Sequence, residues 1–412
     1  MTRTVAITGF GILSALGRGA AETSAALRAG RSGVVSMRPS WAKAGLRSQV
    51  AGYVDAGPLR ENFDRKQARF LCDAAVLAAE AMKDAIVDAR LEAKEIEDPR
   101  TGIVLGTGAG ASLPDAIALG DRLRERGGAK VGPYQVPLIM GSSLTANLST
   151  IFRVRGHSYS VTSACSTSAH AALIGLDLIR SGRQDRVFVG GAEDVNFYSA
   201  SAFDGMGALS TAYNDDPQRA SRPLDKGRDG FVFGGGAAVL VLEELGLAKA
   251  RGATIRGILR GGGASCDGQD MVVPNGIGAE DSMRLALMDA GVASERIDYI
   301  NLHGTSTPIG DVAEVRAIRN VFGRRVPPLS ATKSMTGHAL GAAGAQEAVF
   351  CLLMMQDRFI APTINLEDPE PLIAELHMPR TAEPWDMQIA LSNSFGFGGT
   401  NCTLVFARDT RH

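Results

Sequence analysis

Residues 158–181 read SYSVTSACSTSAHAALIGLDLIRS, and this stretch decides the fold. A short strand-like run is followed by a Ser/Thr-rich turn around Cys165, and then by a helical segment of mostly Ala, Gly and Leu. A helix that is small and apolar on every face is normally buried between layers, because nothing on its surface requires water. Residues 327–356 repeat this order as PPLSATKSMTGHALGAAGAQEAVFCLLMMQ. The two stretches predict an α/β protein with two related halves.

Strand-like and helical patterns alternate along the rest of the chain, as in layered α/β proteins. The predicted strands are 4–8, 102–106, 158–162, 186–191, 236–243, 254–261, 297–302, 327–331, 388–392 and 402–407. The predicted helices are 20–29, 66–89, 165–181, 280–290, 311–321 and 338–356. Residues 205–236 are rich in Gly, Asp and Arg and are predicted to form a long loop, which is usually a functional feature. Because 412 residues exceed the usual size of one hydrophobic core, we predict an N-terminal half, 1–255, and a C-terminal half, 256–412.

The composition argues against several classes of protein. A formal net charge of −1 argues against an extended nucleic-acid surface. The five cysteines are scattered and never in Cys-x-x-Cys spacing, which argues against a structural zinc or a disulfide framework and for a reducing compartment. No apolar run reaches the about 18 residues of a membrane span, and the N-terminus has no apolar targeting stretch. We expect a cytoplasmic protein with no membrane or nucleic-acid partner.

Three Gly/Ser/Thr-rich turns each present one side chain of a catalytic type. They hold Cys165, His303 in the sequence NLHGTSTP (301–308), and His338 in the sequence KSMTGHALG (333–341). Taken singly, a free cysteine or a histidine at such a place is also compatible with a structural role. Turns between strands and helices are where α/β sheets place their active sites. The joint occurrence of the three side chains therefore indicates a catalytic site.

The position of Cys165 suggests how its thiol is activated. The residue lies where a predicted strand ends and a predicted helix begins. The N-terminus of a helix carries partial positive charge and free amide donors, so we expect the pKa of the thiol to be lowered. The same amides would hold the oxyanion that forms when the sulfur attacks a thioester.

The presence of two histidines favours carbon–carbon bond formation over hydrolysis. Hydrolysis by a cysteine needs one imidazole as a base and a group that orients it. Condensation needs the cysteine to hold an acyl group while a second thioester loses carbon dioxide and becomes a carbon nucleophile. Two N–H donors that converge on the enolate oxygen would stabilise this nucleophile, and both histidines would then act in the neutral form.

Characteristic motifs are spread over nearly the whole chain, around these residues and between them. They are Ile7-Thr-Gly-Phe-Gly, Val131-Gly-Pro-Tyr, Ser163-Ala-Cys-Ser-Thr-Ser, Gly207-Ala-Leu-Ser-Thr, Arg228-Asp-Gly-Phe, His303-Gly-Thr-Ser-Thr-Pro, Lys333-Ser-Met-Thr-Gly-His and Ser392-Asn-Ser-Phe-Gly-Phe-Gly-Gly-Thr-Asn. With this set the chain resembles the elongating β-ketoacyl-acyl-carrier-protein synthases of the thiolase superfamily. The resemblance implies an α/β thiolase-like fold, in which two pseudo-duplicated halves form a layered α-β-α-β-α arrangement. Details such as Gly45-Leu-Arg-Ser, Asp64-Arg-Lys and Phe233-Gly-Gly-Gly are closer to type I than to type II.

The resemblance implies decarboxylative Claisen condensation with malonyl-acyl-carrier protein, to give β-ketoacyl-acyl-carrier protein in fatty-acid elongation. Cys165 is then the acylated nucleophile, and His303 and His338 are the pair that acts in decarboxylation. Lys333 and Glu347 match a pair that organises the site electrostatically.

Further matches concern the substrate. Phe397 matches a gating aromatic whose amide, with that of Cys165, forms the oxyanion hole. Thr305 and Thr307 match contacts to the pantetheine arm. Ala109 aligns where a bulky side chain limits the chain length in some relatives, so we expect a fairly open acyl pocket.

The resemblance also implies partners. A patch that docks the acidic carrier protein is matched by Arg65, Lys66 and Arg69, which share one face of a predicted helix. A cluster that holds a monovalent cation in some relatives is matched by Asn301, Glu347, Ser392 and Asn393. No other cofactor is expected, and the family usually forms a homodimer.

Four other functions remain to be weighed. Residues 5–14 begin like a dinucleotide-binding fingerprint, but Ser14 replaces the third glycine and no strand-end acid follows about 20 residues on. A catalytically silent subunit of the same fold would lack the active cysteine. A cysteine hydrolase would release a free acid, whereas condensation yields carbon dioxide and a β-ketoacyl thioester. A ketosynthase of a polyketide or specialised-lipid pathway would use the same site with a different carrier, and this alternative stays open.

Overall fold

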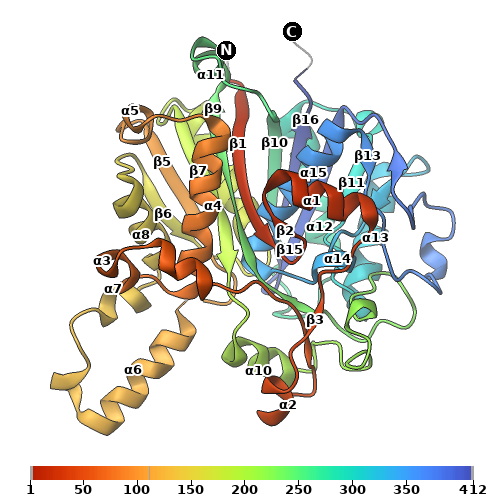
Figure 1. Cartoon of the computed structure of the whole chain (residues 1–412). Coiled ribbons are helices and arrows are strands. Elements are labelled where there is room, and N and C mark those ends of the chain that lie inside the picture. Colours follow the sequence, from red (N-terminus) through yellow and green to blue (C-terminus); the bar gives the residue numbers. More distant parts are fainter. Residues whose placement is uncertain (1–2, 111, 410–412) are drawn as a thin grey trace.

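A mixed β-sheet organises the molecule in the computed structural model, which describes residues 3–110 and 112–409 (Figure 1). In spatial order its main strands are β12 (Leu329–Ser330), β11 (Tyr299–Asn301), β15 (Ile389–Gly396), β16 (Thr400–Ala407), β10 (Gly257–Cys266), β1 (Val5–Ser14), β9 (Gly236–Glu244), β7 (Arg186–Glu193), β5 (Thr101–Gly106) and β6 (Ser158–Val161). The short strand β2 (Gly17–Arg18) pairs with one end of β1. Two smaller sheets consist of β3 (Val35–Ser36), β4 (Val50–Gly52) and β8 (Phe233–Gly234), and of β13 (Phe359–Ile360) and β14 (Glu383–Pro384).

The main sheet contains the same arrangement of strands twice. Numbered along each half, the spatial order is 3-2-4-5-1, as β6-β5-β7-β9-β1 in the first half and β12-β11-β15-β16-β10 in the second. In both halves the second strand is parallel to its two neighbours, and the remaining pairings are antiparallel. The halves join where β1 pairs with β10. The predicted pseudo-duplication is therefore present in the topology, while the division between residues 255 and 256 stays a prediction.

Helices form three layers around the strands. The central helices α9 (Thr167–Arg180) and α15 (Ala343–Asp357) contact each other and the strands of both halves. The outer helices α4 (Asp73–Ala89) and α8 (Ser143–Phe152) pack on the first half, and α12 (Ile277–Ala290) and α13 (Pro308–Phe322) cover the second. Every residue of α15 from Ala343 to Met355 is buried, as expected for a small apolar helix. The predicted layered α/β fold is confirmed.

The remaining elements are shorter and lie mostly at the edges. They are α1 (Gly19–Ala29), α2 (Ser40–Lys43), α3 (Arg65–Ala68), α5 (Ala93–Ile96), α6 (Leu113–Arg126), α7 (Gln135–Ile139), α10 (Phe197–Gly205), α11 (Leu245–Ala250) and α14 (Lys333–Thr336). Helix α6 stands away from the body at the lower left of Figure 1. The predicted loop is present between Met206 and Val232, where the regular structure is limited to a 3-10 turn, Pro217–Arg219. Within the described residues, no helix has the length and apolarity needed to cross a membrane.

Two pairs of glycines show the duplication at the level of residues. A Cβ at Gly9 or Gly11 of β1 would lie 2.5 Å and 2.0 Å from backbone atoms of α4. A Cβ at Gly261 or Gly263 of β10 would lie 2.5 Å and 2.3 Å from backbone atoms of α12. The strand register also shifts at Gly9 and at Gly261. The Gly-x-Gly of β1 therefore serves close helix packing, which accounts for its likeness to a dinucleotide fingerprint.

Two predicted helices differ from the structure. The helix predicted over 66–89 is interrupted between α3 and α4, where the Arg60 guanidinium donates to the carbonyls of Ala68 and Leu71 and so stabilises the break. The helix predicted over 338–356 begins at Ala343. His338 precedes it in extended pairing, because its amide donates to the carbonyl of Val232 and its carbonyl accepts from the amide of Gly234.

Candidate active site

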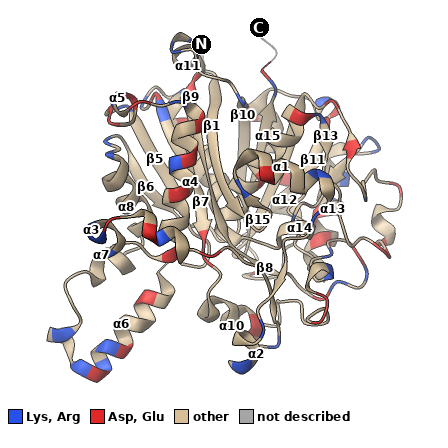
Figure 2. Cartoon of the chain, viewed as in Figure 1, with Lys and Arg blue, Asp and Glu red and all other residues tan. Residues whose placement is uncertain are grey.

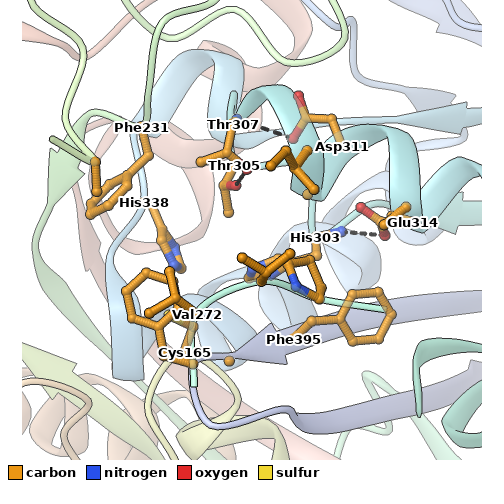
Figure 3. Close-up of a pocket in the computed structure, with 18 of the residues that line it drawn as sticks. Cys165, Phe231, Val272, His303, Thr305, Thr307, Asp311, Glu314, His338 and Phe395 are labelled. Atoms are coloured by element: carbon orange, nitrogen blue, oxygen red, sulfur yellow. Dashed lines mark hydrogen bonds between the residues drawn. The ribbon is translucent and has the colours of Figure 1, made fainter. Parts of the chain in front are cut away.

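Three turns from the two halves meet at one cavity of about 380 Å³ (Figure 3). Cys165 follows β6 and precedes α9, His303 follows β11, and His338 lies between α14 and α15. All three side chains line the cavity. The structure thus brings together the three residues that the sequence singled out.

The thiol of Cys165 is buried where it lines this cavity. Burial raises the pKa of Cys165 to about 12, while the positive charge of Lys333 and hydrogen bonds from the amides of Phe397 and Cys165 oppose this shift. The expectation of a lowered pKa is therefore wrong. The physical reason is that α9 begins only at Thr167, so desolvation of the sulfur outweighs the nearby dipole. The amides of Phe397 and Cys165 thus lie beside the sulfur, and the oxyanion hole expected from them stays a prediction.

The backbone around Cys165 is held in an uncommon conformation. Ala164 has a φ of +50°, which L-residues rarely adopt. Thr400 donates its hydroxyl to the carbonyl of Ser163, and Ser166 donates to the same oxygen. Contacts from both halves therefore fix the turn that presents the sulfur.

The two histidines are neutral hydrogen-bonding groups. The ring centroids of His303 and His338 are 5.2 Å apart, and the rings are almost perpendicular at 88°. Burial, with the positive charge of Lys333, lowers the pKa of both imidazoles well below the usual 6.5. Within the described residues, Nδ1 of His303 and both ring nitrogens of His338 have no hydrogen-bond partner. Buried polar atoms of this kind are normally satisfied, so they indicate a site for a bound oxygen.

A carboxylate that the sequence analysis missed fixes the backbone of His303. The Glu314 side chain on α13 accepts from the amides of His303 and Gly304, each at 2.8 Å. The amide group of Asn393 donates to the same carboxylate at 3.1 Å. Burial raises the pKa of Glu314 to about 7. Glu314 lies eleven residues after His303, near the middle of α13, and no local motif signals this contact.

Two aromatic rings that were also missed enclose the imidazoles. Phe231 lies edge-on to His338 with centroids 5.6 Å apart, and Phe395 lies 5.7 Å from His303. Both rings line the cavity. They restrict rotation of the imidazoles and exclude water, which strengthens hydrogen bonds to a bound substrate.

Lys333 and Glu347 form a buried ion pair next to the cavity rather than in its lining. Lys333 Nζ lies 2.6 Å from Glu347 Oε1, and each side chain is only 2% exposed. Burial raises the pKa of Glu347, and Lys333 opposes the shift. The positive charge of Lys333 lowers the pKa of Cys165 and of both histidines, while the catalytic role expected for the pair stays a prediction.

Of the other residues expected to contact the substrate, some line the cavity and one does not. Thr305, Thr307 and Phe397 line the cavity, and the hydroxyls of the two threonines are 3.0 Å apart. Ala109 does not line it but packs against the apolar cluster that includes Cys165. The acyl pocket expected at Ala109 therefore stays a prediction.

Three of the four expected cation ligands are grouped. Asn301 lies close enough to Glu347 to lower the pKa of its carboxyl, and Asn301 Nδ2 donates to the Ser392 hydroxyl at 3.4 Å. Glu347 Oε2 has no partner within the described part of the chain. The side chain of Asn393 instead bonds to Glu314 and accepts from Thr403. A buried, unpartnered carboxylate oxygen beside other oxygens suits a hard cation, so the first three residues fit such a group.

Basic residues expected to dock a carrier protein lie on the surface of the first half. Arg65, Lys66 and Arg69 are exposed on and just after α3, and Figure 2 shows further basic positions at the far end of α6. The Arg69 guanidinium stacks on Tyr134 and donates to its hydroxyl. Arg69 is thus held in place, while Arg65 and Lys66 point into solvent.

The duplicated layered fold and the Cys-His-His cavity define a ketosynthase of the thiolase-like class, and the chain belongs to the β-ketoacyl synthase family. The model of the β-ketoacyl synthase N-terminal domain matches residues 2–248, and that of the C-terminal domain matches residues 256–367.

Curated relatives place the chain near one branch of the family. It is 48% identical to a 3-oxoacyl-[acyl-carrier-protein] synthase 1 of Haemophilus influenzae over 99% of both chains. It is 46% identical to the protein of that name from Escherichia coli over 98% of both chains. The expected closeness to type I is confirmed.

Solved structures agree in fold. A β-ketoacyl synthase from Burkholderia phymatum superposes with a TM-score of 0.92 at 37% identity, covering 99% of this chain and all of the other. The ishigamide ketosynthase/chain length factor gives a TM-score of 0.92 at 34% identity, with the same coverage.

Proposed function

We propose that this protein elongates fatty acids by decarboxylative condensation of an acyl group on Cys165 with malonyl-acyl-carrier protein. The observation that carries the proposal is the meeting of a buried thiol and two neutral imidazoles at one cavity, where three of the four ring nitrogens have no hydrogen-bond partner among the described residues. The relatives named 3-oxoacyl-[acyl-carrier-protein] synthase 1, at 46% and 48% identity, support the assignment to fatty-acid elongation.

The first step transfers the acyl group to the enzyme. The Cys165 sulfur attacks the carbonyl carbon of the acyl thioester, and the amides of Cys165 and Phe397 stabilise the oxyanion. The carbon–sulfur bond to the carrier breaks, and the proton from Cys165 ends on the carrier thiol. Because the thiol has a pKa of about 12, the proton leaves as the sulfur attacks, helped by the positive charge of Lys333.

The second step forms the carbon–carbon bond. The carbon–carbon bond to the malonyl carboxylate breaks, carbon dioxide leaves, and the electron pair forms an enolate. Its oxygen accepts hydrogen bonds from His303 and His338, whose lowered pKa keeps them neutral donors. The enolate carbon attacks the acyl carbonyl on Cys165, the thiolate leaves, and the β-ketoacyl chain remains on the carrier.

The proposal extends to partners. Arg65, Lys66 and Arg69 dock the acidic carrier protein, which brings its arm to Thr305 and Thr307 in the cavity. A solved ketosynthase in complex with an acyl-carrier protein, from a type II polyketide system, matches with a TM-score of 0.89 at 28% identity. The enzyme works in the cytoplasm as a homodimer, and a monovalent cation binds at Asn301, Glu347 and Ser392, with Asn393 placing the neighbouring Glu314.

A polyketide or specialised-lipid ketosynthase is the second candidate. The likeness to the ishigamide ketosynthase favours it, but at 34% identity this match is weaker than those to synthase 1. The two candidate enzymes would share the same active site and would differ in the carrier protein that they accept.

The test is the mass of the intact protein after incubation with acyl-carrier proteins that carry short to long chains. We expect Cys165 to gain one acyl group, including long ones because Ala109 is small, and Cys165→Ala to gain none. Addition of malonyl-carrier protein should release carbon dioxide and the β-ketoacyl thioester. Release of free acid without carbon dioxide would overturn the proposal in favour of a hydrolase.

A further inference from the structure

One wall of the cavity is a strained turn. Residues 304–308 carry Thr305 and Thr307, whose hydroxyls face the cavity (Figure 3). Gly304 has a φ of +39° and Ser306 a φ of +74°, and the latter is unfavourable for a residue with a side chain. A turn of this kind persists only where its surroundings hold it.

Buried acceptors hold the amides of this turn. Asp311 Oδ1 accepts from the amides of Ser306 and Thr307 at 3.1 Å and 3.3 Å. Its other oxygen accepts from the amide of Leu224 at 2.8 Å. Burial raises the pKa of Asp311 to about 6, and the neighbouring Arg228 opposes the shift. The amides thus depend on a carboxylate that needs a compensating cation to stay ionised.

Arg228 holds the carbonyls of the same turn. Its Nε donates to the carbonyl of Thr307 at 3.2 Å, and its Nη2 donates to that of Pro308 at 2.8 Å. Its Nε also lies 3.4 Å from Asp311 Oδ2. The side chain is 3% exposed and does not line the cavity. A planar guanidinium can meet two carbonyls and a carboxylate at once, which a lysine cannot do.

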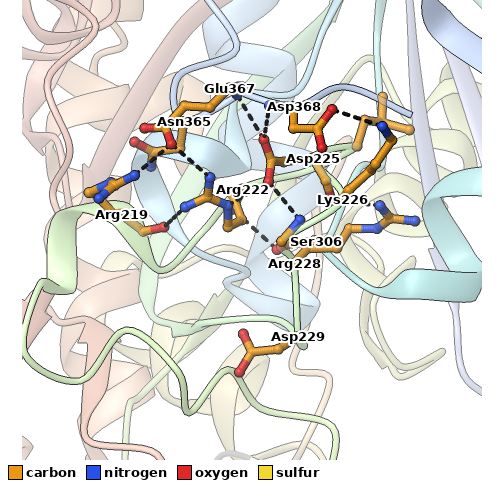
Figure 4. A network of polar contacts seen from close by, with 12 residues as sticks. Arg219, Arg222, Asp225, Lys226, Arg228, Asp229, Ser306, Asn365, Glu367 and Asp368 are labelled. Atoms are coloured by element: carbon orange, nitrogen blue, oxygen red, sulfur yellow. Dashed lines mark hydrogen bonds and ion pairs between the residues drawn. The ribbon is translucent and has the colours of Figure 1, made fainter. Parts of the chain in front are cut away.

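On the side away from the turn, Arg228 is anchored to the polar network that includes Asp225, Glu367 and Asp368 (Figure 4). Its Nη1 donates to the carbonyl of Asp225 at 2.6 Å and to Glu370 at 2.7 Å. Asp225 also pairs with Arg222 and accepts from the amides of Glu367 and Asp368. The contacts with Asp225 and Glu370 therefore fix the guanidinium on the side away from the turn.

The neighbours of Arg228 in the sequence serve the cavity in other ways. Asp229 accepts from the Ser210 hydroxyl and the amides of Thr211 and Ala212, and Phe231 packs against His338. The motif Arg228-Asp-Gly-Phe thus touches three segments around the cavity. Arg228 is the member that reaches the turn carrying the two threonines, at the carbonyls of Thr307 and Pro308.

We propose that Arg228 is a positioning residue for the pantetheine arm, because it holds Thr305 and Thr307 in place through the carbonyls of residues 307 and 308. This inference rests on the proposed function, which assigns the arm to the two threonines. Arg228 acts through the turn, so it sets how well the arm binds and leaves the chemistry at Cys165 unchanged.

The test compares two acyl donors that differ only in the arm. One is an acyl thioester of pantetheine, and the other is the same acyl thioester of ethanethiol. Acylation of Cys165 is followed by intact mass. For Arg228→Lys we expect about a tenfold loss with the pantetheine donor, as for one or two lost hydrogen bonds to a charged group. The ethanethiol donor should react as with the wild type, and the loss should lie in KM rather than kcat.

Control variants separate this inference from the proposed function. Arg219→Lys, in the same segment but 45% exposed, should leave both donors unaffected. Thr305→Ala and Thr307→Ala should lose the preference for pantetheine. If they do while Arg228→Lys keeps it, only the role of Arg228 is overturned. If they keep the preference, the threonine assignment and this inference both fail.

Two further outcomes would overturn the inference. Equal losses with both donors would show that Arg228 is merely structural, as would a loss confined to kcat. If Arg228→Lys does not fold, Glu370→Gln provides the second variant, since it removes one anchor of the guanidinium at a site that is 25% exposed. It should give a smaller loss of the same selective kind, and unselective loss or none would contradict the proposal.

Discussion

The two halves of the molecule hold equivalent turns by the same device and use them differently. In the first half, buried Glu193 accepts from the amides of Gly108 and Ala109 in the turn after β5. In the second half, buried Glu314 accepts from the amides of His303 and Gly304 in the turn after β11. Burial raises the pKa of both carboxyls to about 7. The scaffold is shared, while the turn presents a methyl group in one half and an imidazole in the other.

The turns after the third strand differ in length. Residues 162–166 link β6 to α9 in the first half and present Cys165 directly. Residues 331–342 link β12 to α15 in the second half, and this longer segment carries both Lys333 and His338. In the mechanism that we propose, the first half holds the acyl group, and the second half supplies the charges and donors. Variants in the two halves should affect different steps.

The largest effect is expected from the buried ion pair of the second half. Lys333→Met leaves the Glu347 carboxylate buried without a partner, so we expect the free energy of unfolding to fall by about 3–5 kcal/mol. Chemical denaturation would measure this loss. Arg153→Met in the first half breaks a pair in which the arginine is 74% exposed, and should cost less than about 1 kcal/mol. Similar losses in the two variants would contradict this contrast.

The second-largest effect is expected from the two histidines of the cavity. His303→Ala and His338→Ala should each slow carbon dioxide release from malonyl-carrier protein by about 10²–10³-fold, the usual effect of losing one oxyanion donor. Acylation of Cys165 should be affected much less. The matched control is His170→Asn in the first half, whose imidazole bonds to the Ser163 hydroxyl. If His170→Asn slows decarboxylation as strongly, the assignment of donors to the second half is wrong.

Replacement of the two carboxylates should separate the steps. A glutamine leaves one of the amide donors unpaired, which costs about 1–3 kcal/mol. Glu314→Gln displaces His303 and should slow decarboxylation, whereas Glu193→Gln displaces the turn at Ala109 and should slow acylation by long chains. Rates of the two half-reactions, measured separately, would check this. If both variants slow the same half-reaction, the assignment of the two turns to different steps is wrong.

The raised pKa values of Glu193 and Glu314 predict that the stability of the protein depends on pH. Each carboxyl has a folded pKa of about 7 instead of 4.5, so its contribution to stability is complete below about pH 4.5 and is lost as the pH rises through 7. The glutamine variants lack this term. The unfolding free energy of the wild type, relative to each variant, should fall by up to about 1.4 kcal/mol per pH unit across that window. A flat difference would show that the carboxyls are not perturbed.

The smallest effect is expected at the surface of the first half. Arg65→Ala and Lys66→Ala remove exposed charges, so each should weaken carrier-protein binding by less than about 1 kcal/mol. The loss should shrink as salt is added. Binding titrations at two salt concentrations would measure it, and a salt-independent loss would argue against electrostatic docking.

Local sequence patterns determined much of the fold. Alternation of strands and helices, and the apolar segments 165–181 and 338–356, predicted the layered architecture because periodicity follows directly from which faces are buried. The same patterns located Cys165, His303 and His338 in turns. The sequence did not reveal the repeated Gly-x-Gly packing of β1 and β10, because those glycines become equivalent only when each strand lies against its helix.

Tertiary structure decided the electrostatics of the site. The helix start next to Cys165 predicted a lowered pKa, but the fold buries the sulfur, and desolvation depends on everything packed around it. Glu314 and Phe231 line the cavity, and Arg228 holds the turn at Thr307 from behind it; each depends on folding that no local pattern identifies. The sequence alone thus determined which reactive groups this protein has and in which turns they lie. Only the packing of its two halves decided their charge state and their support, because both depend on long-range burial.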